Sequence, residues 1–233
     1  MKAMKILIIL LFLGISMPVW AFNTETEIQI NSTNWVNTGC LEGNGVLKKE
    51  KKKLAPFNKI RINGVFNVTI VQQAIPFFEM SADANLFSRI QIRVIKNQLQ
   101  IDSTGSLCPK LPIKINIGLP ELKEVQGLGA DDITISNLTN EYFTVNMDGS
   151  CDISITGHTK TFTVTMTGAG DLNAFRFKAD KISILSSGAG NSEVFATKLL
   201  KAHIDGAGDI AFQGHPEKVI VSGDGVGDVI QGD

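Results

Sequence analysis

The second half of the chain alternates apolar and polar residues in segments that recur at almost equal intervals. When the five glycines that follow these segments are set in register, they stand 19, 20, 18 and 19 residues apart. The positions six and four residues before each glycine are all apolar, which predicts β-strands with one buried face. The glycines are Gly149, Gly168, Gly188, Gly206 and Gly225, and the apolar residues are Phe143, Val145, Phe162, Val164, Ile182, Ile184, Leu200, Ala202, Val219 and Val221.

A second short strand is predicted after each glycine-rich stretch. Strings such as MTGAGDL at 166–172 and IDGAGDI at 204–210 place an Asp, then an apolar residue, directly after the second glycine. Each unit is therefore a strand, a corner, a second strand and a return. Because one unit cannot bury its apolar face alone, we expect the units to stack about 4.8 Å apart in a parallel β-solenoid. A β-propeller or a β-sandwich is the rival fold, but the repeat is too short for a four-stranded blade.

The corners are predicted to need glycine for two reasons. Glycine tolerates the positive torsion angles of a tight corner, and small residues let successive corners pack closely. The corner glycines are Gly149, Gly168, Gly170, Gly188, Gly190, Gly206, Gly208, Gly225 and Gly227.

The residues before the repeats also predict β-structure. Residues 124–133 form an imperfect earlier unit, and residues 59–71 alternate as one or two strands. Residues 77–81 are a further strand, and residues 89–102 are a hairpin that turns at Asn97-Gln98. Because no linker rich in Pro, Gly or Ser separates the two halves, we expect the N-terminal strands and hairpin to continue the same all-β core.

The first 21 residues are typical of a signal peptide. Lys2 and Lys5 precede the apolar stretch Ile6–Ile15, and Ala21 suits cleavage by signal peptidase. No later apolar stretch reaches the ~20 residues of a membrane-spanning helix. We therefore expect the protein to be exported and to be periplasmic, on the outer surface or secreted.

The expected organisation of the chain follows from these patterns. Residues 1–21 are the signal peptide, residues 22–55 are an N-terminal segment with the first strands, and residues 56–233 are the solenoid domain, with repeats over about 120–233. The formal net charge is −1, or about −3 without the two leader lysines. This near-neutral balance argues against a nucleic-acid partner.

The chain has three cysteines, which allow one disulfide in an oxidising compartment. Cys151 lies inside the repeats, whereas Cys40 and Cys108 lie in loops marked by Gly or Pro. This placement favours a Cys40–Cys108 disulfide, although the spacing alone leaves the other pairings open.

Three features of the chain occur together over about residues 40–233: PFNKIRINGVFNVTI at 56–70, SADANLF at 81–87 and the serial Gly-x-Gly-Asp-apolar units. Their combination gives a resemblance to the head GIN domain family of adhesin-like bacterial proteins. It implies a right-handed parallel β-helix-like fold in an envelope or secreted protein, and it implies no established catalytic residues. Cys151 and Asn191 depart from the Gly and Asp of the family pattern, which weakens any ligand-binding role for those columns.

An acidic column is the sharpest candidate site. Stacked carboxylates attract hard cations such as Ca²⁺. The alternative, which we favour, is that each Asp caps its own corner by accepting backbone N–H bonds. We therefore predict no metal site and no cofactor. The column consists of Asp152, Asp171, Asn191, Asp209 and Asp228.

The lysine-rich stretch KKEKKK at 48–53 has two interpretations. It could contact anionic glycans or lipid head groups. More often such a stretch is a solvated strand edge, where lysines also oppose aggregation.

No catalytic constellation stands out in the sequence. His158 and His203 are scattered, no nucleophile motif is present, and only Asp180 or Glu193 beside Lys181 resembles the acids of β-helix lyases and hydrolases. We therefore predict a non-catalytic binding or adhesin-like module that presents flat faces to a glycan, an envelope component or a protein partner. A carbohydrate-active lyase or hydrolase and a structural envelope scaffold are the alternatives, and the oligomeric state is left open.

Overall fold

The computed structural model describes residues 39–232. The predicted signal peptide, Met1–Ala21, lies outside the described residues, as do residues 22–38. The elements are β1 (Leu41–Glu42), β2 (Leu47–Lys51), β3 (Lys59–Asn63), β4 (Asn67–Gln72), β5 (Phe77–Asp83), the 3₁₀ helix η1 (Ala84–Arg89), β6 (Ile90–Ile95), β7 (Gln98–Ser103), β8 (Leu107–Cys108), β9 (Lys114–Leu119), β10 (Glu124–Gly127), β11 (Asp132–Met147), β12 (Asp152–Met166), β13 (Leu172–Ser186), β14 (Ser192–Ile204), β15 (Ile210–Gln213), β16 (Lys218–Ser222) and β17 (Val229–Gln231).

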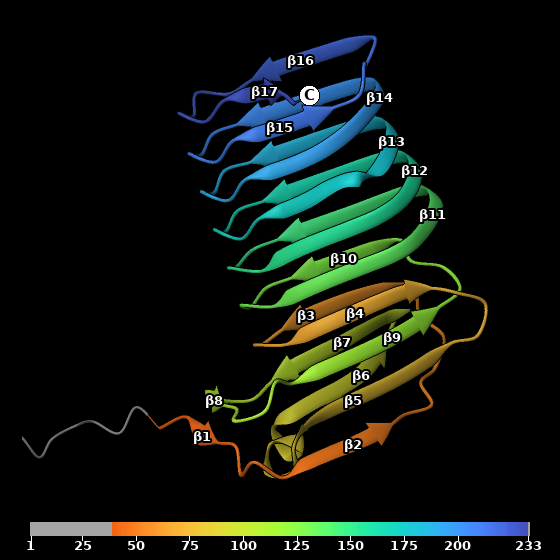
Figure 1. Cartoon of the computed structure of the whole chain (residues 1–233), viewed down its shortest axis with the longest axis vertical. Coiled ribbons are helices and arrows are strands. Elements are labelled where there is room, and N and C mark those ends of the chain that lie inside the picture. The colour runs from red at the N-terminus through yellow and green to blue at the C-terminus, as the bar shows by residue number, and fades with distance from the viewer. Residues whose placement is uncertain (1–38, 233) are drawn as a thin grey trace, which may run out of the picture. The chain divides into compact units, whose positions relative to one another are not determined.

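The stacked parallel strands confirm the predicted all-β solenoid, which has about 5 turns. Each of the long strands β11 to β14 bends near its middle and joins two sheets. Their first halves continue the sheet of β4 and β15, and their second halves continue the sheet of β10 and β16. We call these the first and second sheets. The glycine corners form the corner edge, and the bends form the bend edge, visible as curved ribbons at the right of Figure 1.

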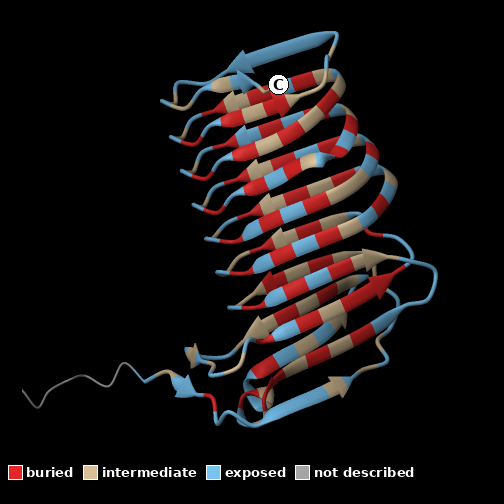
Figure 2. Cartoon of the chain, viewed as in Figure 1, coloured by how far each residue is buried: buried red, intermediate tan, exposed pale blue. Residues whose placement is uncertain are grey.

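The core lies between the two sheets and is built by the predicted alternation. Buried and exposed positions alternate along the strands in Figure 2. Eight of the ten predicted core residues are at most 2% exposed. The prediction is wrong for the last pair, because Val219 and Val221 are 40% and 56% exposed. No further coil among the described residues covers β16.

The corner glycines stack directly on one another. A Cβ atom on Gly168 would lie 1.8 Å from the carbonyl oxygen of Gly149, and one on Gly188 would lie 1.8 Å from that of Gly168. The predicted need for positive torsion angles is wrong, because none of the corner glycines has a positive φ, and the glycines that do, such as Gly157 and Gly223, are at other positions. Close approach between coils is therefore what requires glycine at these positions.

The N-terminal strands continue the same core. β4 pairs with β11 and β3 with β10, so residues 59–71 form two strands of one coil. The predicted hairpin is β6–β7, but its turn is at Lys96 and Asn97, one residue earlier than predicted, and both have positive φ. None of the described residues belongs to a helix with the length and apolar character needed to cross a bilayer.

Antiparallel strands cover the N-terminal end of the solenoid. β2 pairs with β5, and β5 pairs with β9. Lys48 places its Nζ 4.4 Å from the centre of the Phe87 ring, and Glu50 lies within 3.4 Å of Lys48 and 3.2 Å of Lys52. The lysine-rich stretch thus supplies an edge strand with charges on both faces, which opposes pairing with another sheet.

A disulfide joins Cys40 to Cys108, with 5.5 Å between their Cα atoms. It fastens the residue before β1 to the last residue of β8. Asp83 fastens the same region, since its carboxylate accepts hydrogen bonds from the backbone N–H groups of Gly45, Lys110 and Leu111. Burial opposes its ionisation, but these hydrogen bonds hold the pKa of Asp83 below its ordinary value.

Candidate binding groove at the bend edge

A groove follows the bend edge across successive coils. It consists of two adjoining hollows of about 730 and 560 Å³, which share Thr139, Asn140 and Glu141. The first hollow also includes Gln72 and Tyr142, and the second continues over the bends of β12 to β14. We call the two hollows together the bend-edge groove.

A column of alternating charge runs along the groove, and its first three members, Glu141, Lys160 and Asp180, line the groove. Glu141, Lys160, Asp180 and Lys198 lie on successive coils, and each lies eight residues before a corner glycine. Lys160 pairs with Glu141, and the Nζ of Lys198 lies 2.8 Å from the Oδ2 of Asp180. Because the four charges cancel, the column attracts no strongly charged ligand. It presents rows of charge-assisted donors and acceptors to the solvent.

The ion pairs set the protonation of the carboxylates in this column. A hydrogen bond from Lys160 lowers the pKa of Glu141. Hydrogen bonds from Lys198 and then Thr197 lower the pKa of Asp180. A general acid needs a raised pKa to hold its proton at neutral pH. Both carboxylates are therefore suited to accept hydrogen bonds and not to donate a proton.

Tyr142 is the exposed aromatic residue of the groove. It is 68% exposed, and its hydroxyl group has no hydrogen-bond partner among the described residues. Beside it, Asn140 donates a hydrogen bond of 2.8 Å to the carbonyl oxygen of Leu122, while the Oδ1 of Asn140 is buried and has no partner among the described residues. The groups of the groove that a ligand can reach are therefore the exposed ring of Tyr142 and the exposed charged side chains.

The Asp column lies at the opposite, corner edge and links the coils. The Oδ1 of Asp152 accepts a hydrogen bond from the backbone N–H of Asp171, and Asp171 and Asn191 repeat this contact one coil further on, at 2.7 to 2.9 Å. Asp209 does the same for the N–H of Asp228. The prediction that each Asp caps its own corner is thus corrected, because the acceptor serves the next coil.

The hydrogen bonds of the Asp column account for Asn191, which can accept as Asp does. No group of three or more His, Cys, Asp or Glu side chains within residues 39–232 is arranged to hold a metal ion. The coil-to-coil hydrogen bonds give these carboxylates a structural use that needs no cation.

Replacing Asp171 with Ala is expected to lower the free energy of unfolding by about 1 kcal/mol, because it leaves the N–H of Asn191 without its acceptor. Asp171→Asn should be close to wild type, as Asn191 already fills the same role. Urea unfolding measures both variants. Equal losses for Ala and Asn, or a rise in Tm on adding millimolar Ca²⁺ to the wild type, would instead favour a cation ladder.

Cys151 and Asp131 occupy the inner column that glycines fill in later coils. The Sγ of Cys151 lies in space left by Gly127, where a Cβ would be 2.4 Å away. The Oδ1 of Asp131 accepts a 2.9 Å hydrogen bond from the N–H of Phe66, and its buried Oδ2 has no hydrogen-bond partner within residues 39–232. Burial raises the pKa of Asp131 to about 6. Burial, with the nearby Asp131 and Asp152 charges, also raises the pKa of the Cys151 thiol to about 12, which makes it unreactive.

The structure separates the residues considered for catalysis. Lys181 pairs with Thr161 and Leu199 in the second sheet, whereas Glu193 pairs with Asn173 in the first sheet. The partner of Asp180 is Lys198 of the next coil. Glu193 is therefore not beside Lys181, and Asp180, which precedes Lys181 in the chain, is paired with Lys198 instead.

Residues 56–216 match the family model described as "Putative auto-transporter adhesin, head GIN domain". The chain belongs to the head GIN domain family. Among solved structures, one described as a "putative adhesin" from Bacteroides fragilis is 23% identical, with a TM-score of 0.67 over 82% of this chain and 99% of that one. A "putative lipid binding protein" from Parabacteroides distasonis is 20% identical, with a TM-score of 0.56 over 84% of this chain and 100% of that one. At these identities the likeness shows the fold. No curated protein matches the chain.

Proposed function

We propose that this protein is an exported, non-catalytic, adhesin-like module that binds an extended polysaccharide in the bend-edge groove. The observation that carries the proposal is the exposed ring of Tyr142 beside a charge-balanced row of donors and acceptors that spans several coils. Sugar rings pack an apolar face on aromatic side chains, and their hydroxyl groups both donate and accept hydrogen bonds.

The polarity of the groove favours a neutral or weakly charged glycan. The four side chains of the charged column are exposed and paired, so they contribute little to stability. The same pairing holds the carboxylate and ammonium groups in fixed positions, where they can form hydrogen bonds with the hydroxyl groups of a glycan. The family match and the adhesin descriptions of similar structures are consistent with a binding role outside the cell. The lowered pKa of Asp180 and its separation from Glu193 speak against lyase or hydrolase chemistry.

Tyr142→Ala is expected to weaken polysaccharide binding at least about tenfold, as is typical for an aromatic anchor in an interface. Because the side chain is exposed, the variant should unfold within about 0.5 kcal/mol of the wild type. A glycan array of bacterial and host polysaccharides identifies the ligand, and calorimetry compares the variants. Lys201→Ala is the matched control, an exposed side chain on the outer surface of the second sheet. No binding to any glycan on the array, or equal losses of affinity in the two variants, would contradict the proposal.

A further inference from the structure

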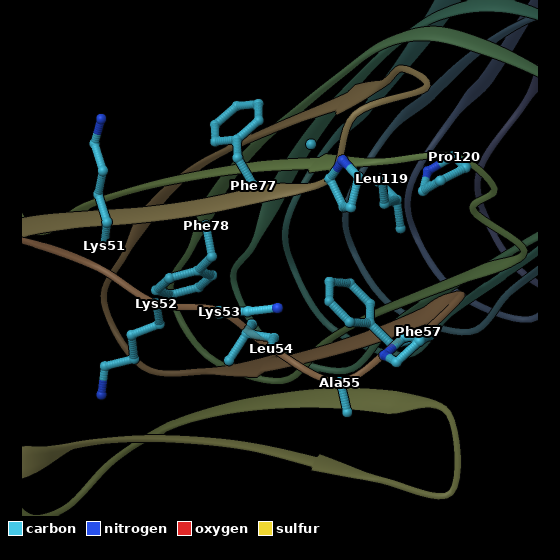
Figure 3. A pocket seen from close by; sticks show the side chains of 13 residues that line it. Lys51, Lys52, Lys53, Leu54, Ala55, Phe57, Phe77, Phe78, Leu119 and Pro120 are labelled. Atoms are coloured by element: carbon cyan, nitrogen blue, oxygen red, sulfur yellow. The ribbon is translucent and has the colours of Figure 1, made fainter.

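A second, largely apolar pocket lies at the N-terminal end of the solenoid. Its volume is about 590 Å³, within the range of small-molecule sites. It forms where residues 52–57 cross from β2 in the first sheet to β3 in the second. The residues that line it come from three separate parts of the chain. Figure 3 shows Leu54, Phe57, Phe78 and Leu119 around the cavity, whereas the ring of Phe77 points to the other face of β5.

The walls of this pocket belong partly to the core and partly to the surface. Phe78 and Leu119 are 3% and 1% exposed, and they form a fixed apolar floor. Leu54 and Phe57 are half-buried, and Phe77 is 41% exposed. Phe77 lies opposite Gly118 in the β5–β9 pair, where a Cβ would come within 2.3 Å of the ring. The glycine thus leaves room for the Phe77 ring on the outer face of the β5–β9 pair, opposite the face from which Phe78 lines the pocket.

The charged residues that line the pocket are all basic. In Figure 3 Lys51 and Lys52 lie toward one end of it, Lys53 lies beside Leu54, and Leu119 and Pro120 lie toward the other end. Lys51 is 3.4 Å from Glu79 and Lys52 is 3.2 Å from Glu50, but neither acid lines the pocket. Lys53 has no ion pair among residues 39–232. A complementary ligand has an apolar body and an anionic end.

We propose that this pocket binds a single-chain amphiphile with an anionic head group, a long-chain fatty-acid carboxylate. The acyl chain lies against Phe57, Phe78 and Leu119, and the carboxylate lies beside Lys53. This activity is separate from polysaccharide binding, because the pocket meets the bend-edge groove only at Pro120. A recess of this size takes up one chain, whereas docking on a bilayer would need a flat apolar surface.

Calorimetry with monomeric laurate, using the chain as exported, tests the proposal. We expect one laurate per protein and an affinity that rises about fourfold for each added methylene. Dodecyltrimethylammonium, which has the same chain and a cationic head, should bind at least about tenfold more weakly. Equal affinities for the two head groups, or no dependence on chain length, would overturn the proposal.

Two lysine variants locate the head group. Lys53→Glu should weaken laurate binding about tenfold, because it replaces attraction by repulsion. Lys49→Glu is the matched control from the same lysine-rich stretch, and it lies outside the pocket lining. It should bind as the wild type does, since salt screens exposed charges beyond about 8 Å. Equal effects of the two variants, or binding to phosphatidylglycerol vesicles without binding of monomeric laurate, would show a general surface attraction and overturn the pocket assignment.

Discussion

Gly168→Ala is expected to destabilise the protein by about 3 kcal/mol or more, the range of severe overpacking. The new Cβ would lie 1.8 Å from the carbonyl oxygen of Gly149 and 2.5 Å from its backbone nitrogen. Both contacts are with backbone atoms, so no side-chain rotation relieves them. The coils would have to separate, which would break the 2.8 Å hydrogen bond from the N–H of Ala169 to the same carbonyl oxygen.

Urea unfolding of Gly168→Ala measures this loss, and Gly105→Ala is the matched control. Gly105 has a φ of 74° and nothing within 4 Å of its Cβ position. Its replacement should therefore cost only about 1–2 kcal/mol from the strained torsion angle. If Gly168→Ala cost no more than Gly105→Ala, close stacking would not be the reason for the repeated glycines.

The stability of the wild type relative to Asp131→Asn is expected to fall as the pH rises from about 4 to about 6. The folded protein holds the proton of Asp131 up to a pKa of about 6, whereas the unfolded chain releases it near 3.8. Between these values the folded state binds more protons than the unfolded state, so raising the pH favours unfolding. The shift corresponds to about 3 kcal/mol.

The asparagine variant isolates this effect from other titrating groups. Asn keeps an oxygen that can accept the hydrogen bond from the N–H of Phe66 and carries no charge. Asp83, whose pKa is lowered, contributes stability that is lost at low pH, and it does so equally in both proteins. Denaturant unfolding at several pH values gives the difference. A difference that stays constant, or that changes in the opposite direction, would contradict the burial of an ionisable Asp131.

Much of the fold was predictable because stacking imposes one requirement on every coil. Apolar residues at two fixed offsets from each glycine, as in Phe162 and Val164, identified the core columns. The same register contained a signal for the groove, since Glu141, Lys160 and Asp180 all stand eight residues before a corner glycine with alternating sign. These charged residues are exposed and belong to no apolar pattern, so a search for periodic apolar residues did not find them.

Other features depend on contacts that one repeat does not encode. The space for Cys151 comes from Gly127 in the preceding coil, and the hydrogen bond of Asp131 comes from Phe66, which is 65 residues away. The lysine-lined pocket joins residues near 54, 77 and 119. The sequence could predict that the lysine-rich stretch is an exposed edge strand. It could not predict the apolar cavity beside that strand, because the cavity needs residues from distant parts of the chain.

Hydrogen–deuterium exchange of the backbone amides, with and without an oligosaccharide taken from the array, tests the central proposal most directly. If the ligand lies in the bend-edge groove, protection should rise in residues 139–142, 158–160 and 178–180, while the corner edge near Gly149, Gly168 and Gly188 stays unchanged. Protection confined to the corner edge or to the flat outer faces, with the bends unaffected, would contradict it.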